Sequence, residues 1–372
     1  MPRIADYDYP LPPKLVAQYP LPQRDASRLL VLRRDVGEIR HSAFRHLGDW
    51  LDADDLLVIN DTRVFPARLR GTKASGGQVE LLLHRLPEPE GNGAGEKDVE
   101  GGGQGSETHL QSSLKLHKTA LARATFRARR GLKPGQLLHF GPALEAEVIS
   151  LSQPGVAEVR FFSRSPDTCQ AVLEAGEVPL PPYVRRSPDG QDRERYQTVF
   201  AEAVGAIACP TAGLHFTDAV LGELGRRGIE VVSLTLHVGP GTFMPVRDDD
   251  YTEHRLQPEY FILPQATAAR LNRARAQGKR LVGVGTTTVR VLEYCAAAEG
   301  FRAQSGWCDL FIYPGYQFKA VDRLLTNFHL PKSTLLLLVS AFAGRDLIMR
   351  AYQEAIKENY RFYSYGDCML IL

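Results

Sequence analysis

Three histidines stand in turns rich in glycine and proline, where their side chains can face a ligand. His215 lies in CPTAGLHFT, His237 in LTLHVGPGTFMPV and His329 in TNFHLPKSTLL. Imidazole exchanges a proton near neutral pH, so each is a candidate for general acid or base catalysis, and a hydrogen-bonded core histidine is the alternative. None of them has HxxxH or HExxH spacing, so the sequence predicts no metal site.

The string GVGTTTVR at residues 283–290 suits the binding of an anion. A predicted strand ends there and a predicted helix begins, so backbone N–H groups, the hydroxyls of Thr286 and Thr287, and the guanidinium of Arg290 can converge. An ordinary threonine cap is the alternative. The string is neither a Walker A loop nor GxGxxG, which argues against a nucleotide triphosphatase or a typical dinucleotide-binding protein.

Two polar segments near the N-terminus, QRDASRLLVL and NDTRVFPARL, are further candidates for a site. The second follows DLLVIN, whose unbroken apolar character predicts a buried strand at residues 55–60. Polar side chains directly after such a strand suit the lining of a cleft, although salt-bridged turns explain them as well. The candidates are Arg24, Arg28, Asn60, Asp61 and Arg63.

Strand and helix patterns alternate from about residue 166 onward, which predicts a parallel or mixed α/β sheet. The expected strands are DLLVIN, EVVSLTLHV, RLVGVG, CDLFIYP and CMLIL, and the expected helices are TDAVLGELGRRG, PQATAARLNRARAQGK and TTTVRVLEYCAAA. The polar clusters fall where strands end, at the edge where open α/β sheets bind ligands.

Residues 68–164 differ from their flanks, because short strand-like runs alternate there with Gly and Pro, as in a small antiparallel barrel or sandwich. We therefore predict an α/β catalytic domain formed by residues 1–67 and 165–372, with a β-domain inserted at 68–164. Within the insertion, residues 87–113 are acidic and Gly-rich, which predicts a flexible loop without chemistry.

The composition limits the class of protein. The chain of 372 residues has a net charge of +2, so any contact with RNA must be local, and the best basic stretch contains Arg127, Arg129 and Arg130. A solvated strand face is the alternative for these arginines. Five scattered cysteines and the lack of a signal peptide or a long apolar run predict a cytoplasmic protein outside the membrane, with no disulfide framework.

Nine strings in order resemble the S-adenosylmethionine:tRNA ribosyltransferase-isomerase family of queuosine biosynthesis. They are RDASRLLVL, NDTRVFPARL, LPPY, ERYQTVFA, PTAGLHFT, TLHVGPGTFMPV, VGTTTVRVLE, FIYPGYQF and TNFHLPKSTLL. The resemblance implies an α/β domain with a β-barrel insertion. It also implies transfer and isomerisation of the ribosyl group of S-adenosylmethionine onto 7-aminomethyl-7-deazaguanine at the wobble position of tRNA, giving epoxyqueuosine with release of adenine and methionine.

This reaction needs a base, an acid and a neutral amine as nucleophile. His215, His237 and His329 are the first candidates for proton transfer, with Asp61 and Glu259 as alternatives, and their roles stay unassigned. Phe243 and Tyr313 are candidates to face the sulfonium. The remaining substrate-binding candidates, from the matched strings, are Thr211, Gly213, Gly239, Gly241, Thr242, Asn327 and Ser333.

Two departures from the family pattern are visible. EHRLQPE has Leu256 and Gln257 where the family often shows EHxMHxE, so no histidine can act at position 257, and Cys209 replaces an alanine that is usual before PTAGLHFT. We expect tRNA and S-adenosylmethionine as partners, no metal, no cofactor beyond this co-substrate, and a monomer. An RNA methyltransferase and a non-catalytic RNA-binding protein are the alternatives.

Overall fold

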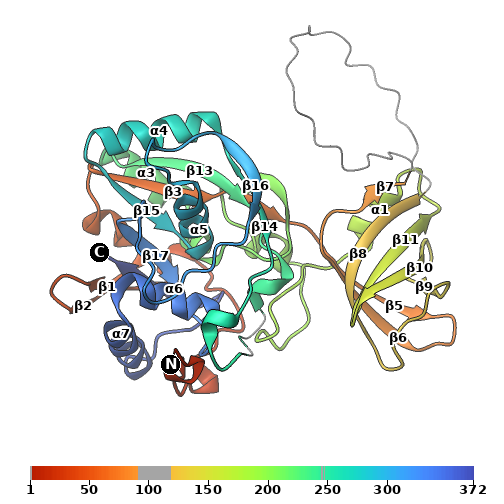
Figure 1. Ribbon diagram of the computed structural model, residues 1–372. Coiled ribbons are helices and arrows are strands. Elements are labelled where there is room, and N and C mark those ends of the chain that lie inside the picture. The colour runs from red at the N-terminus through yellow and green to blue at the C-terminus, as the bar shows by residue number, and fades with distance from the viewer. Residues whose placement is uncertain (1, 91–118, 244–245, 247) are drawn as a thin grey trace, which may run out of the picture. The chain divides into compact units, whose positions relative to one another are not determined.

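The computed structural model describes residues 2–90, 119–243, 246 and 248–372, which form two compact units (Figure 1). Unit 1 comprises Met1–Val64 and Leu180–Leu372, and unit 2 comprises Phe65–Pro179. Helix α1 (Thr168–Ala175) belongs to unit 2, although we expected the insertion to end at residue 164. Its Val172 is fully buried where the helix packs on strands of that unit. Of the expected loop at 87–113, residues 91–113 lie outside the described part.

Unit 1 is built on a mixed sheet in the order β16-β14-β13-β3-β15-β17-β18-β1-β2. β13, β3, β15 and β17 run parallel to one another, so their carboxyl ends lie at one edge. The strands are β1 (Arg28–Arg33), β2 (Glu38–Ala43), β3 (Asp55–Asn60), β13 (Glu230–Leu236), β14 (Glu259–Leu263), β15 (Arg280–Val284), β16 (Gln304–Cys308), β17 (Arg323–Asn327) and β18 (Cys368–Ile371). β4 (Thr62–Val64) and β12 (Ala203–Ala206) form a separate parallel pair.

Helices cover both faces of this sheet (Figure 1), and alternate residues of its strands enter two different cores. On β3, Leu56 and Val58 join the core beneath α4 to α7, whereas Leu57 and Ile59 join the core that contains α3. A strand buried on both faces needs apolar residues on both, which accounts for the continuous apolar run Leu56–Ile59 between Asp55 and Asn60. The helices of this unit are α2 (Asp192–Arg195), α3 (Asp218–Arg226), α4 (Gln265–Ala276), α5 (Thr286–Cys295), α6 (Thr334–Ala343) and α7 (Arg345–Lys357).

The helix starts differ in how they are capped. The side chain of Thr217 accepts a hydrogen bond from Val220 N at the start of α3, and Ser333 does the same for Leu336 N of α6. The N-cap of α5 is Gly285, which has no side chain to offer. Short 3-10 helices complete the unit: η1 (Ile4–Tyr7), η2 (Pro13–Leu15), η3 (Arg24–Ala26), η4 (Phe44–Trp50), η5 (Thr211–His215), η6 (Pro240–Phe243) and η7 (Tyr251–Glu253).

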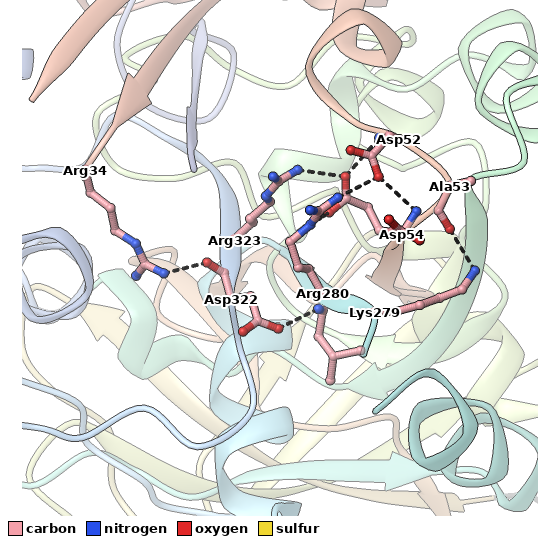
Figure 2. A network of polar contacts seen from close by, with 10 residues as sticks. Arg34, Asp52, Ala53, Asp54, Lys279, Arg280, Asp322 and Arg323 are labelled. Carbon is pink, nitrogen blue, oxygen red and sulfur yellow. Dashed lines mark hydrogen bonds and ion pairs between the residues drawn. The ribbon is translucent and has the colours of Figure 1, made fainter. Parts of the chain in front are cut away.

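The amino ends of the central strands are held together by charge (Figure 2). The fully buried carboxylate of Asp55, at the start of β3, accepts hydrogen bonds from Arg280 Nε at 2.8 Å and Arg323 Nη1 at 2.7 Å. Arg280 also pairs with Asp52 at 2.6 Å. These charged side chains satisfy one another's hydrogen bonds at the amino edge of the sheet, opposite the carboxyl ends of the strands. We therefore interpret the network as stabilising the fold.

Unit 2 is a closed antiparallel β-barrel, because β11 pairs with β8 as well as with β10. The order β11-β10-β9-β5-β6-β8 returns to β11, and β7 extends the sheet beside β8. The strands are β5 (Arg68–Lys73), β6 (Gln78–Leu83), β7 (Glu88–Pro89), β8 (Thr119–Ala128), β9 (Leu137–His139), β10 (Leu144–Gln153) and β11 (Val156–Ser163).

The predicted fold class is confirmed, as an α/β unit with a mixed sheet and a smaller antiparallel barrel. One predicted strand is wrong. In CDLFIYP, β16 ends at Cys308 and the following residues form no strand. The aromatic side chains of Phe311 and Tyr313 in this segment pack against each other, and the backbone there does not pair with a neighbouring strand.

Candidate active site

A cleft opens at the carboxyl edge of the parallel strands, with an empty volume of about 610 Å³ that includes open solvent. The turns that follow β15 and β17 contribute much of its lining, together with η5 and the segment before β18. The lining comprises Tyr183, residues 208–212, Val238, residues 285–287, residues 326–330, Leu335 and residues 363–364. This is the edge at which α/β sheets bind ligands, and the sequence clusters converge on it.

The N-terminus of α5 lines this cleft through Gly285, Thr286 and Thr287. Gly285 has a φ of +87°, a conformation that glycine adopts without strain, and the helix start has no side-chain cap. Thr288 Oγ1 donates to Val284 O at 2.8 Å, so this hydroxyl is not a cap either. The first N–H groups of a helix carry partial positive charge, which makes this end of the cleft suited to an anion.

His215 is buried and lines a smaller pocket rather than the cleft, with both ring nitrogens engaged. Ser27 Oγ is 2.7 Å from Nδ1, and Asn327 Nδ2 is 3.3 Å from Nε2. Since Asn327 Nδ2 can only donate, Nε2 accepts, which places the proton on Nδ1. Burial lowers the pKa of His215 to about 4, so the ring is neutral at pH 7.

His329 is the histidine that lines the cleft. Its Nε2 lies 2.8 Å from Thr326 Oγ1, its backbone N–H donates to Tyr352 Oη, and its carbonyl accepts from Tyr9 Oη. Burial lowers the pKa of the ring to about 3, so this imidazole is neutral and a weak base.

His237 is less buried than the other two and does not share their surroundings. Its Nδ1 lies 2.8 Å from Thr62 Oγ1, its ring stacks on Tyr260, and a Cβ at Gly205 would come within 2.7 Å of Cε1. Nε2 has no hydrogen-bond partner in the described part of the chain. Burial lowers the pKa of the ring, and the nearby Asp61 carboxylate opposes this shift. The next residue, Val238, lines the cleft.

Glu259 forms a buried ion pair with Arg290, and its Oε1 accepts the N–H of Gly239 at 2.8 Å. Arg290 also donates to the carbonyls of Leu310 and Cys308. Both charged residues line a second pocket of about 390 Å³. The guanidinium of Arg290 is therefore paired with Glu259. Through its hydrogen bond to Gly239 N, Glu259 holds the start of the segment that contains Gly239 and Gly241.

Asn60 and Asp61 connect the ends of β3 and β13. Asn60 Oδ1 accepts from Leu236 N and Thr62 N, and its Nδ2 donates to Leu236 O and, at 3.3 Å, to Thr287 Oγ1. Asp61 Oδ1 accepts from Thr235 Oγ1 at 2.6 Å. These contacts explain why β3 ends with an amide and is followed by a carboxylate. Asn60 also connects Thr287 of the cleft to Thr62, whose hydroxyl contacts His237.

The other candidate residues fall into different surroundings. Arg24 lines a smaller pocket beside His215, Thr211 lines the cleft, and Ser333 caps α6. Arg28 lies over Tyr360, Arg63 is exposed, and Gly213 packs where a Cβ would come within 2.7 Å of Thr198 Cγ2. Tyr313 packs on Tyr251 and Phe311, and the cleft lining does not include it. The side chains of Thr242 and Phe243 lie outside the described part.

The basic stretch of unit 2 is exposed. Arg127 lies on β8, and Arg129 and Arg130 follow in the turn after it, so the three do not all lie on one strand face. Within the described residues none of the three takes part in an ion pair.

Comparison with known proteins gives a match over almost the whole chain. The model of a family described as "Queuosine biosynthesis protein" matches residues 4–371. The chain belongs to this family.

Its relatives share its full length. The S-adenosylmethionine:tRNA ribosyltransferase-isomerase of Syntrophotalea carbinolica is 47% identical over 372 residues and 100% of both chains. The protein of the same name from Geobacter sulfurreducens is 47% identical over 99% of both chains. A crystal structure of an S-adenosylmethionine tRNA ribosyltransferase from Thermotoga maritima has 34% identity and a TM-score of 0.53, and covers 99% of this chain and 100% of that one. The predicted family membership is confirmed.

For this queuosine biosynthesis protein, the cleft contains residues that sequence reasoning did not single out. Tyr183 and Ser364 line it and lie 2.6 Å apart through their hydroxyl oxygens, and Tyr363 packs on Tyr183. Tyr183 ends the string LPPY, one of the strings that resemble the family. Its aromatic type in a proline-rich turn is the signal that was available.

Within the residues described, no group of three or more His, Cys, Asp or Glu side chains is placed to hold a metal ion. The same residues contain no helix that is long and apolar enough to span a membrane.

Proposed function

We propose that this protein is an S-adenosylmethionine:tRNA ribosyltransferase-isomerase of queuosine biosynthesis. It transfers and isomerises the ribosyl group of S-adenosylmethionine onto 7-aminomethyl-7-deazaguanine at the wobble position of tRNA, releasing adenine and methionine. The observation that carries this conclusion is the family match over residues 4–371, together with curated relatives of that name at 47% identity over the full length.

The cleft of unit 1 is the proposed site of this reaction. It combines a helix N-terminus without a side-chain cap, buried polar groups and aromatic side chains, which suit a charged, partly aromatic co-substrate. A wobble base lies in a single-stranded loop, so it can enter such a site at a small unstacking cost.

We assign the proton transfers by geometry first and pKa second. His237 is the first candidate because it precedes Val238 of the cleft lining, its ring is only partly buried and its Nε2 is unpartnered among the described residues. His329 is the second, since it lines the cleft although burial weakens it as a base. His215, with both nitrogens engaged, serves to position Asn327.

Asp61 and Glu259 act through other groups in this proposal. Glu259 is held by Arg290 and positions Gly239, and Asp61 favours the protonated form of His237. Arg127, Arg129 and Arg130 are the proposed contacts for tRNA phosphates, because exposed guanidinium groups outside ion pairs are suited to them. In this proposal the substrate is tRNA in the cytoplasm and the co-substrate is S-adenosylmethionine. That the protein is a monomer and that it needs no metal both stay predictions.

The test is the release of free adenine, measured by chromatography after mixing the protein with S-adenosylmethionine and tRNA that carries 7-aminomethyl-7-deazaguanine. Adenine and methionine should appear in equal amounts. The matched control is the same tRNA with guanine at the wobble position, which lacks the nucleophilic amine and should give no adenine. Formation of S-adenosylhomocysteine would indicate methyl transfer and contradict the proposal.

A further inference from the structure

Two features of the cleft lie side by side at the ends of neighbouring strands. β15 and β17 are paired, with Val284 opposite Leu325, and Gly285 N donates to Leu325 O at 2.8 Å. The N-terminus of α5 follows one strand and Asn327 ends the other. Gly285, Thr286, Thr287 and Asn327 all line the cleft, so both features belong to its lining.

The first feature is the start of α5, which lacks a cap. Gly285 provides no side chain, and among the described residues no side-chain acceptor binds the N–H groups of Thr286, Thr287 or Thr288. α5 has ten residues, so its dipole is well developed. A carboxylate here would accept hydrogen bonds from these N–H groups.

The second feature is the side-chain amide of Asn327, which is only 3% exposed. Its Nδ2 lies 3.0 Å from Tyr363 O, 3.4 Å from Asp367 O and 3.3 Å from His215 Nε2, which are all acceptors. Its Oδ1 is buried and has no partner among the residues that the structure describes. A buried acceptor without a partner is unfavourable, so its retention at a cleft calls for an explanation.

The acceptors around Asn327 also limit what it can recognise. An asparagine that reads the edge of an adenine uses both its carbonyl and its amino group. Here the amino group is engaged by three protein acceptors, so only Oδ1 is available. A lone acceptor suits a group that only donates, such as an ammonium.

We propose that the cleft binds the α-amino-acid group of S-adenosylmethionine, with the carboxylate on the N-terminus of α5 and the ammonium on Asn327 Oδ1. This assignment rests on the proposed function, because that function supplies the co-substrate. Asn327 is then a binding residue, and His215 is a positioning residue that fixes the direction of its amide.

The experiment compares two thioethers as competitive inhibitors of adenine release. S-adenosyl-L-homocysteine carries the amino-acid group and 5′-methylthioadenosine lacks it, and neither is a sulfonium. The wild-type protein should be inhibited at least tenfold more tightly by S-adenosylhomocysteine. In Asn327→Ala this ratio should fall about tenfold or more, while the inhibition constant of methylthioadenosine stays the same, because loss of a charge-assisted hydrogen bond acts on the amino-acid group alone.

Decarboxylated S-adenosylhomocysteine separates the two ends of the group. It keeps the ammonium, so Asn327→Ala should weaken it as well, and in the wild-type protein its loss of affinity reports the carboxylate at α5. The matched control is Asn272→Ala, because the amide of Asn272 is satisfied by Phe301 N and Phe301 O away from the cleft. This variant should keep the wild-type ratio.

Equal inhibition of the wild-type protein by the two thioethers would overturn the proposal, and that comparison holds even when Asn327→Ala does not fold. An unchanged ratio in folded Asn327→Ala would also overturn it, as would equal weakening of both inhibitors. If the wild-type protein released no adenine at all, the proposed function would fail instead, so the two failures are distinguishable.

Discussion

Replacing Glu259 by Gln should destabilise unit 1 strongly, because it removes one charge of a buried pair. The side chains of Glu259 and Arg290 are 6% and 8% exposed, so Arg290 would stay buried without its counter-charge. Breaking such a pair costs about 3–5 kcal/mol. At roughly 2–4 °C per kcal/mol for a domain of this size, the Tm should fall by about 6 °C or more.

The assay is thermal unfolding followed by circular dichroism at pH 7, with Glu223→Gln as the matched control. Glu223 also binds arginines, but at the surface of α3, where solvent screens the attraction, so its Tm should barely change. Equal Tm values for the two variants would refute the view that the Glu259–Arg290 pair is a buried anchor of the segment at Gly239. A normal Tm for Glu259→Gln with lost turnover would instead return Glu259 to the candidates for proton transfer.

Three further predictions concern the histidines and the tRNA contact. His237→Asn should lower turnover by about 10² to 10⁴ with both KM values and the Tm retained, and turnover within about fivefold of wild type would move the role to His329. Burial holds the pKa of His215 at about 4 and that of His329 at about 3, both below the unfolded value of about 6.5, so protonation favours unfolding. Stability in urea should therefore fall by up to about 1 kcal/mol per pH unit for each histidine as the pH drops from 6 toward the folded pKa, and replacing either by Gln should remove its share of this slope. Changing Arg127, Arg129 and Arg130 to Ala should weaken tRNA binding and reduce its salt slope by roughly 0.7 to 0.9 per lost contact, and an unchanged slope would make them a solvated surface.

The sequence predicted the fold well where each strand must be buried on both faces. All six residues of β3 are buried, and the apolar run Leu56–Ile59 at its centre is visible in DLLVIN without any knowledge of partners. CDLFIYP was wrongly predicted as a strand, because it is a similar short apolar run. Its aromatic residues pack against other side chains and do not pair as a strand. Periodicity alone does not separate these two uses of a short apolar run.

The roles of single side chains were much less predictable. His215 and His329 occur in the same kind of turn as His237, yet their environments differ, and the ring partners of His215 and His237 come from distant parts of the chain. Ser27 is 188 residues from His215, and Asn327 is 112 residues from it. No local pattern encodes such contacts. The missing cap of α5 is an exception, since Gly285 before three threonines could have suggested an open helix end.

The most direct test of the proposed reaction is mass spectrometry of nucleosides from tRNA incubated with the protein and S-adenosylmethionine labelled with ¹³C in its ribose. The account predicts that the label moves to the wobble nucleoside, which gains the mass of epoxyqueuosine, in an amount equal to the adenine released. Label that remains in the nucleoside part of S-adenosylhomocysteine, with an unlabelled or methylated tRNA, would contradict it.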